Sequence, residues 1–189
     1  MYMVFMYCMI INNNILEDFM NKKFLDAMNE QMNFEFESAF IYKAMSAYLA
    51  RLDLDGMVHF MDMQVEEEII HGDDFKVFLQ DLGYDVKYRA LDPGEGEYKD
   101  VVDVFKSALE HEKLVTANIN RLYDEAREIN DRRAEIFLQT YIQEQIEEED
   151  TFTKLVTKLE RIDGNWHGLY MLDAELGTRP QPTPMNPEE

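Results

Sequence analysis

The sequence predicts an all-α protein: a four-helix bundle with one long crossover between the second and third helices and a short fifth helix near the C-terminus. Four stretches carry apolar residues at alternating steps of three and four, which keeps their side chains on one face of a helix. Glycine and proline are scarce, at 8 and 5 residues, and they fall between these stretches. With 189 residues, 46% of them hydrophobic, the chain suits one domain with a substantial core.

The first two periodic stretches predict an antiparallel helical hairpin. The first helix should run roughly over 21–50. After a short turn, the second should continue to about Leu82, where Gly83 ends it. We expect Asp53 or Asp55 to cap the start of the second helix, because a carboxylate there can accept from the first free backbone N–H groups.

The last two periodic stretches predict a second hairpin, which a long connection reaches. Residues 83–96 show no helical period, and their roughly 14 residues at about 3.3 Å each can travel the ~40 Å length of a helix. The third helix should span about 98–127, and the fourth should end near Ile162. Short, long and short connections in that order make the second and third helices parallel. A short fifth helix is expected at 166–176.

Both ends of the chain are expected to lie outside the bundle domain, which we place at 20–177. Residues 1–19 begin with an almost wholly apolar run without Lys or Arg. This run is too short to span a bilayer and lacks a cleavage signal, so we expect a poorly ordered extension and no membrane anchor. The tail at 178–189 holds four of the five prolines and is expected to be disordered.

The charge and the cysteine content restrict the partners and the compartment. Asp and Glu total 39 against 18 Lys and Arg, a net charge of −21, which opposes binding to nucleic acid and to anionic membranes and favours cations. The one cysteine, Cys8, cannot form an internal disulfide or a paired-cysteine metal site. This cysteine usage suits a reducing compartment, and we expect a cytoplasmic protein.

Polar residues interrupt each apolar seam close to the middle of its helix. All of them should therefore lie at one height in the bundle, whichever way the helices run. Moving one carboxylate out of water costs on the order of 20 kcal/mol in the idealised limit, and a bound cation removes that cost. The interruptions are Glu35, Glu68, His71, Glu112, Gln145 and Glu148.

The spacing of these residues fits a pair of metal ions. Glu35 precedes Glu68 by 33 residues, and Glu112 precedes Gln145 by 33. The Glu-x-x-His pair in the second helix places two ligands one turn apart on one face. Oxygen-rich ligation with one imidazole suits iron(II) or manganese(II), and zinc can also occupy such a site.

Three further acidic residues lie beside the seams. Glu67 precedes Glu68, while Glu144 and Glu147 flank the seam of the fourth helix. Acidic groups next to the polar layer predict a further cation site at its edge.

Several segments of the chain resemble the prokaryotic non-haem ferritins, members of the ferritin-like diiron-carboxylate family. The resemblance covers about 20–176, and the motifs appear in the order and at the spacing of that family. They lie at 29–35, 66–71, 111–112, 137–149 and 168–176. The resemblance implies a ferritin-like bundle.

The resemblance also implies the ligands of two irons. The first iron would be bound by Glu35, Glu68 and His71. The second would be bound by Glu68, Glu112 and Glu148, with Glu68 bridging the two ions.

Other residues match positions around this diiron centre. Tyr42 matches a tyrosine that can donate an electron, and Gln145 matches a residue that supports the ligands. The resemblance further implies a third iron bound by Glu67, Glu144, Glu147 and Glu148.

The implied activity is that of an iron-storage ferroxidase. Such a protein oxidises iron(II) with dioxygen or hydrogen peroxide and stores ferric mineral in a hollow shell of 24 subunits. Haem is not expected. A bacterioferritin would carry a second Glu-x-x-His where this chain has Gln145-Ile-Glu-Glu148, and a haem-binding methionine where this chain has Ile69.

Two other classes of protein remain open from the sequence. A different diiron or dimanganese oxidase would use the same ligands on an organic substrate, and a small monomer or dimer would favour it. A non-catalytic acidic four-helix protein would buffer cations or bind a partner. It would bind metal weakly and show no iron-dependent absorbance change in air.

Overall fold

The computed structural model describes residues 2–92, 94 and 96–183, with side chains from Asn21 onward. The described chain contains helices and no strand. The helices are α1 (Tyr2–Ala50), α2 (Asp55–Asp81), α3 (Val101–Glu128), α4 (Arg132–Ile162) and α5 (Trp166–Leu176).

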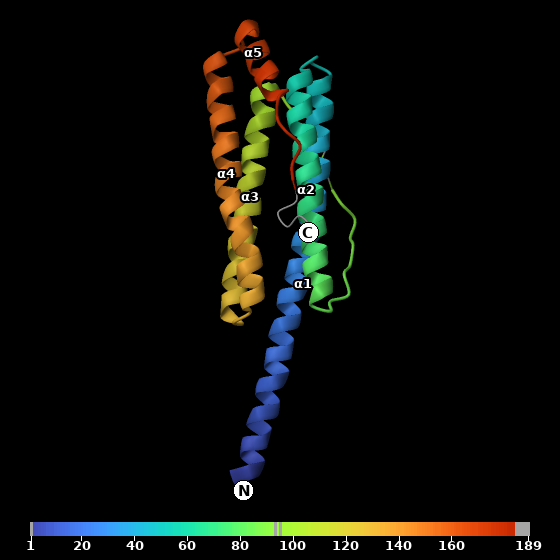
Figure 1. The fold of residues 1–189 in the computed structure, drawn as a ribbon, viewed down its shortest axis with the longest axis vertical. Coiled ribbons are helices and arrows are strands. Elements are labelled where there is room, and N and C mark those ends of the chain that lie inside the picture. The colour runs from blue at the N-terminus through green and yellow to red at the C-terminus, as the bar shows by residue number, and fades with distance from the viewer. Residues whose placement is uncertain (1, 93, 95, 184–189) are drawn as a thin grey trace.

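The helices form two antiparallel hairpins that lie side by side. Figure 1 shows α1 with α2, and α3 with α4, while α5 lies across one end of the bundle. The long connection lets α2 and α3 run in the same direction. The predicted all-α bundle, with its long crossover and short fifth helix, is confirmed. In the part of the chain that the structure describes, no helix is both long and apolar enough to cross a membrane.

Two helices begin at other places than predicted. Helix α1 begins at Tyr2, well before the predicted start at 21, and its first part runs past the end of the other helices (Figure 1). The side chains of 1–20, with that of Cys8, lie outside the described part, so the poorly ordered extension stays a prediction. Helix α3 begins at Val101 because the Asp100 side chain caps it, accepting from the Asp103 N–H at 2.8 Å.

The prediction that Asp53 or Asp55 caps α2 is wrong. The capping position belongs to Leu54, which makes no side-chain bond. The cap comes instead from α5, whose Asp173 carboxylate accepts from the Met57 N–H at 2.8 Å. Local sequence could not reveal this partner, because the bond joins residues 116 positions apart.

Two asparagines of α1 hold the crossover in place. Asn29 forms two bonds with Lys87, donating to its carbonyl at 2.9 Å and accepting from its N–H at 2.8 Å. Asn33, one turn later, donates to the same carbonyl and accepts from the Arg89 N–H at 3.0 Å. The connection is thereby fixed along α1, just before Glu35.

The apolar core divides into two clusters with a polar layer between them. On α1, Met32 belongs to one cluster and Ala39 to the other, and Glu35 lies between them. Each of the other three long helices passes from one cluster to the other in the same way. The residues of the predicted polar layer that are buried at these crossings are Glu35, Glu68, His71, Glu112 and Gln145.

Gly56 sets how closely α5 can pack on α2, and replacing it by alanine tests this contact. A Cβ at position 56 would collide with the main-chain carbonyl of Asp173, which cannot swing aside as a side chain could. We expect Gly56→Ala to lower the free energy of unfolding by roughly 1–3 kcal/mol. It should also speed amide hydrogen exchange in α5. Glu66→Ala, an exposed change on the same helix, is the control, and equal exchange in both variants would contradict the assigned contact.

Candidate metal centre

Helices α1 and α2 bring three buried ligands together at the polar layer. Glu35 is 0% exposed, Glu68 3% and His71 6%. One ligand atom from each lies within 4.8 Å of the other two. Among the described residues, no other group of three or more His, Cys, Asp or Glu side chains converges this closely. The structure thus places the three residues predicted for the first iron side by side.

The carboxylates of this group have oxygen atoms without a hydrogen-bond donor. Gln31 donates to Glu35 Oε1 at 2.8 Å, but Glu35 Oε2 has no partner. Glu68 Oε2 also has none, since the Nδ1 of His71 lies 3.6 Å away, too far for a hydrogen bond. Buried acceptors without partners are costly, and a cation would satisfy both. Two carboxylates and one imidazole fit iron(II), manganese(II) or zinc.

His71 faces a carboxylate on each side of its ring. Its Nδ1 points to Glu68, and its Nε2 lies 3.3 Å from Glu144 Oε2. Burial disfavours the imidazolium, but the carboxylates of Glu144 and Glu68 outweigh burial and raise the pKa of His71 well above its usual value. A ring nitrogen that holds a metal usually leaves the other nitrogen to donate to a carboxylate, and Glu144 is placed for that task.

The Glu112 carboxylate accepts hydrogen bonds from two of the other predicted residues. The Tyr42 hydroxyl donates to Glu112 Oε1, and Gln145 Nε2 donates to Oε2 at 3.0 Å. Gln145 also donates to the Thr116 hydroxyl at 3.3 Å. Burial, followed by the charge of Glu112, raises the pKa of Tyr42 well above its usual value, so the phenol keeps its proton.

Glu148 lies at the margin of the layer. Gln64 Nε2 donates to its Oε2 at 3.2 Å. Burial, together with the nearby charges of Glu112 and Glu67, raises the pKa of Glu148 to about 8. The charge of Glu112 also raises the pKa of Glu68, so these carboxyl groups interact electrostatically across the bundle. The ligand set of the second iron stays a prediction, because Glu68, Glu112 and Glu148 do not form a close group of three.

Among the described residues, those predicted for a third iron do not form a close group of three. Glu144 faces His71, Glu67 is paired with Arg179, and Glu147 is exposed on α4. A third cation site stays a prediction.

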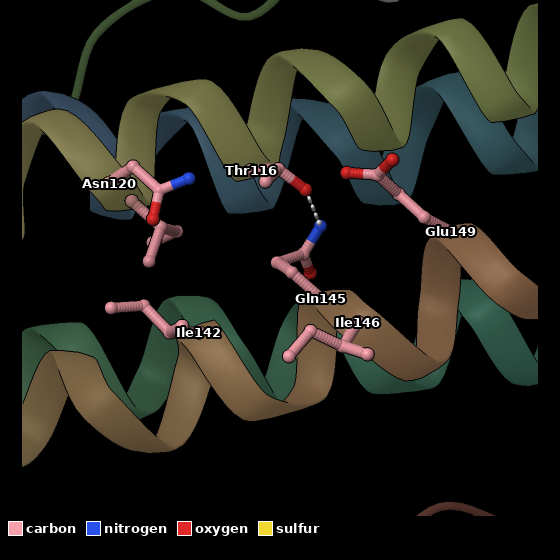
Figure 2. Close-up of a pocket in the computed structure, with 7 residues that line it drawn as sticks. Thr116, Asn120, Ile142, Gln145, Ile146 and Glu149 are labelled. Carbon is pink, nitrogen blue, oxygen red and sulfur yellow. Dashed lines mark hydrogen bonds between the residues drawn. The ribbon is translucent and has the colours of Figure 1, made fainter.

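A cavity of about 290 Å³ opens between α3 and α4 beside the layer. Figure 2 shows Gln145 reaching across to Thr116 in its wall. The cavity is lined by Thr116, Ile119, Asn120, Ile142, Gln145, Ile146 and Glu149. Gln145 therefore stands between this cavity and Glu112.

Sequence reasoning missed several residues that support the layer. Gln31 precedes Glu35 by four residues, and Gln64 precedes Glu68 by four, so each lies one turn from a ligand on the same face. That spacing was a usable signal. The contact of Arg179 with Glu67 had none, because it joins residues 112 positions apart.

Comparison with known proteins identifies the family of the chain. Residues 25–162 match the family described as the ferritin-like domain. The bacterial non-heme ferritin of Staphylococcus aureus strain MRSA252 is 33% identical over 160 residues, which are 85% of this chain and 96% of that protein. A probable bacterial non-heme ferritin-like protein of Haemophilus influenzae is 35% identical over 150 residues, 79% of this chain and 91% of that protein.

Solved structures of archaeal ferritins share the fold. A closed form of the Archaeoglobus fulgidus ferritin, engineered by site-directed mutagenesis, has a TM-score of 0.83 and 33% identity, covering 85% of this chain and 98% of that one. The open pore ferritin of the same archaeon has a TM-score of 0.82 and 34% identity, covering 84% and 98%. By its matched domain, its relatives and its fold, the chain belongs to the ferritin-like family.

Proposed function

We propose that this chain is the subunit of an iron-storage ferritin and oxidises iron(II) at a diiron centre inside its helical bundle. One observation carries the proposal: the partnerless buried oxygens of Glu35 and Glu68 converge with His71 at the middle of the bundle. Without a bound cation, these buried oxygens have no partner to offset the cost of removing them from water. Iron is the substrate and cargo here, which agrees with the ferritins among the relatives.

In this proposal, two iron(II) ions bind next to each other and are oxidised as a pair. Glu35, Glu68 and His71 hold the first, while Glu68, Glu112 and Glu148 hold the second. Each ion loses one electron. Dioxygen accepts both electrons with two protons to give hydrogen peroxide, or hydrogen peroxide accepts them with two protons to give water. The chain contributes by fixing the two ions at a site with open positions.

Hydrogen-bonded neighbours hold the second set of ligands in place. Gln145 and Tyr42 both donate to Glu112, which fixes the direction in which its oxygens point. Tyr42 is also a candidate electron donor, since Glu112 is placed to take the phenol proton when the ring gives up an electron.

Storage would follow oxidation in a shell of 24 subunits. Ferric iron would leave the diiron centre for the interior and form the mineral there, and a third iron at Glu67, Glu144, Glu147 and Glu148 would lie on the edge of the centre. We place this activity in the cytoplasm, a reducing compartment that suits a chain with one cysteine.

Removing two ligands of the first iron should abolish rapid oxidation. We expect Glu68→Ala with His71→Ala to slow the initial absorbance rise of ferric iron in air by roughly 100-fold or more, because both ions lose a ligand. A helical shell should remain by circular dichroism and particle mass. The matched control, Glu66→Ala with His167→Ala, changes an exposed Glu and an exposed His. Equal initial rates in the double variant and the parent would refute the assignment.

Metal binding should release protons, and its affinity should depend on pH. With a pKa of about 8, Glu148 holds its proton at pH 7, and the proton must leave when a metal binds. Affinity should therefore rise as the pH increases through about 8. Zinc titration calorimetry in two buffers of different ionisation enthalpy counts the protons. Glu148→Gln should release fewer, and a count of zero in the parent at pH 7 would contradict the protonated site.

The particle mass separates this function from that of a small diiron oxidase. We expect a shell of about 24 copies by light scattering, as the resemblance implies. A stable monomer or dimer at the same concentrations would favour an enzyme that acts on an organic substrate.

A further inference from the structure

The chain after α5 returns to α2 and lies against it. We call residues 177–183 the C-terminal strap. Figure 1 shows the strap running back along α2 from the end at which α5 lies. Its first residues belong to the predicted disordered tail, yet Thr178 donates to the Glu175 carbonyl at 2.8 Å, and His59 Nε2 lies 2.8 Å from the Arg179 carbonyl oxygen.

Arg179 fastens the strap by contacts with three residues on one face of α2. Its guanidinium lies over the Phe60 ring, 4.5 Å from the ring centre. It donates to the Gln64 side-chain oxygen, and its Nη2 lies 2.5 Å from Glu67 Oε2. Phe60, Gln64 and Glu67 follow one another at steps of four and three, so they line one stripe of the helix.

This stripe adjoins the proposed diiron centre. Gln64, which accepts from Arg179, donates to Glu148 through its other side-chain atom. Glu67 precedes Glu68 in α2, and its side chain is only 18% exposed. A guanidinium is a permanent cation, and here it takes a carboxylate at the edge of the layer.

We propose that Arg179 acts as an internal cation that competes with metal for Glu67, so that an edge metal site fills when the C-terminal strap leaves α2. The inference rests on the proposed function, since it concerns the third site of the same centre. Arg179 Nη2 already lies against Glu67 Oε2, so a metal ion that binds this oxygen must displace the guanidinium, which carries the same sign of charge. The stacking on Phe60 and the bond to Gln64 raise the cost of strap release, which makes the edge site weaker than the two central sites.

The competition is reciprocal by thermodynamic linkage. If the docked strap weakens metal binding at Glu67, then metal at Glu67 must weaken strap docking by the same factor. This gives a readout that does not depend on iron oxidation.

Zinc, which does not change oxidation state, tests the proposal on the full-length assembled protein. By titration calorimetry, the parent and all variants should bind two ions per subunit at the centre. Arg179→Ala should bind a third ion about tenfold more tightly than the parent does. Arg179→Lys, which keeps the charge, should stay near the parent. Arg121→Ala, which removes an exposed arginine paired with Glu125 on α3, is the matched control.

Two further experiments test whether the tighter binding of the third ion comes from Glu67. Adding Glu67→Gln to Arg179→Ala should remove the tighter binding, because the released carboxylate is then gone. In the parent, saturating zinc should speed amide hydrogen exchange in residues 178, 179, 181 and 183 of the strap, and Glu67→Gln should prevent this.

An unchanged third affinity in Arg179→Ala, or a gain that survives Glu67→Gln, would overturn the role of Arg179 while leaving the two central ions in place. Loss of those two ions in every variant, the parent included, would instead overturn the proposed function and this inference with it.

Discussion

The carboxyl groups buried at the middle of the bundle are the constraint on which the rest of the structure depends. Glu35, Glu68 and Glu112 lie where a four-helix bundle is normally apolar, and burial raises the pKa of each. Two glutamines and a tyrosine donate hydrogen bonds, and His71 adds one positive charge. Oxygens of Glu35 and Glu68 still have no partner. The chain alone therefore supplies hydrogen-bond partners for only part of the layer. The remaining oxygens are free to bind a metal ion.

The rest of the fold keeps this costly layer in register. Two apolar clusters, one on either side, provide the burial that stabilises the helices. On one side, Asn29 and Asn33 tie the crossover to α1 close to Glu35. At the end where α5 lies, Asp173 caps α2. Stable ends allow the middle to hold groups that favour a bound cation over a packed core.

Local sequence predicted most of the fold because its signals were local. Scarce glycines and prolines marked the connections, and α5 lies at the predicted residues. Periodicity also identified the polar residues of the layer, since a Glu or His in an apolar seam must point inward. The cap of α2 was predicted wrongly because Asp173, which supplies it, lies 116 residues from Met57.

The site was predictable in its residue types and less so in its pairings. Glu144 was expected as a metal ligand from the resemblance, yet it faces the Nε2 of His71. Glu67 was expected at the same edge site and is bound by Arg179 from a segment predicted to be disordered. Each of these pairings joins two elements through flexible side chains. The spacing of residues along one helix cannot predict these pairings, because they depend on which charged side chain of another element lies nearby.

The central claim is that the polar layer binds two metal ions. The most direct measurement is a crystal structure of the protein soaked with iron(II) without oxygen, with iron located by anomalous scattering. We predict one iron among Glu35, Glu68 and His71 and a second among Glu68, Glu112 and Glu148, each at full or nearly full occupancy. A layer without anomalous density, with iron only on the acidic surface, would contradict the claim.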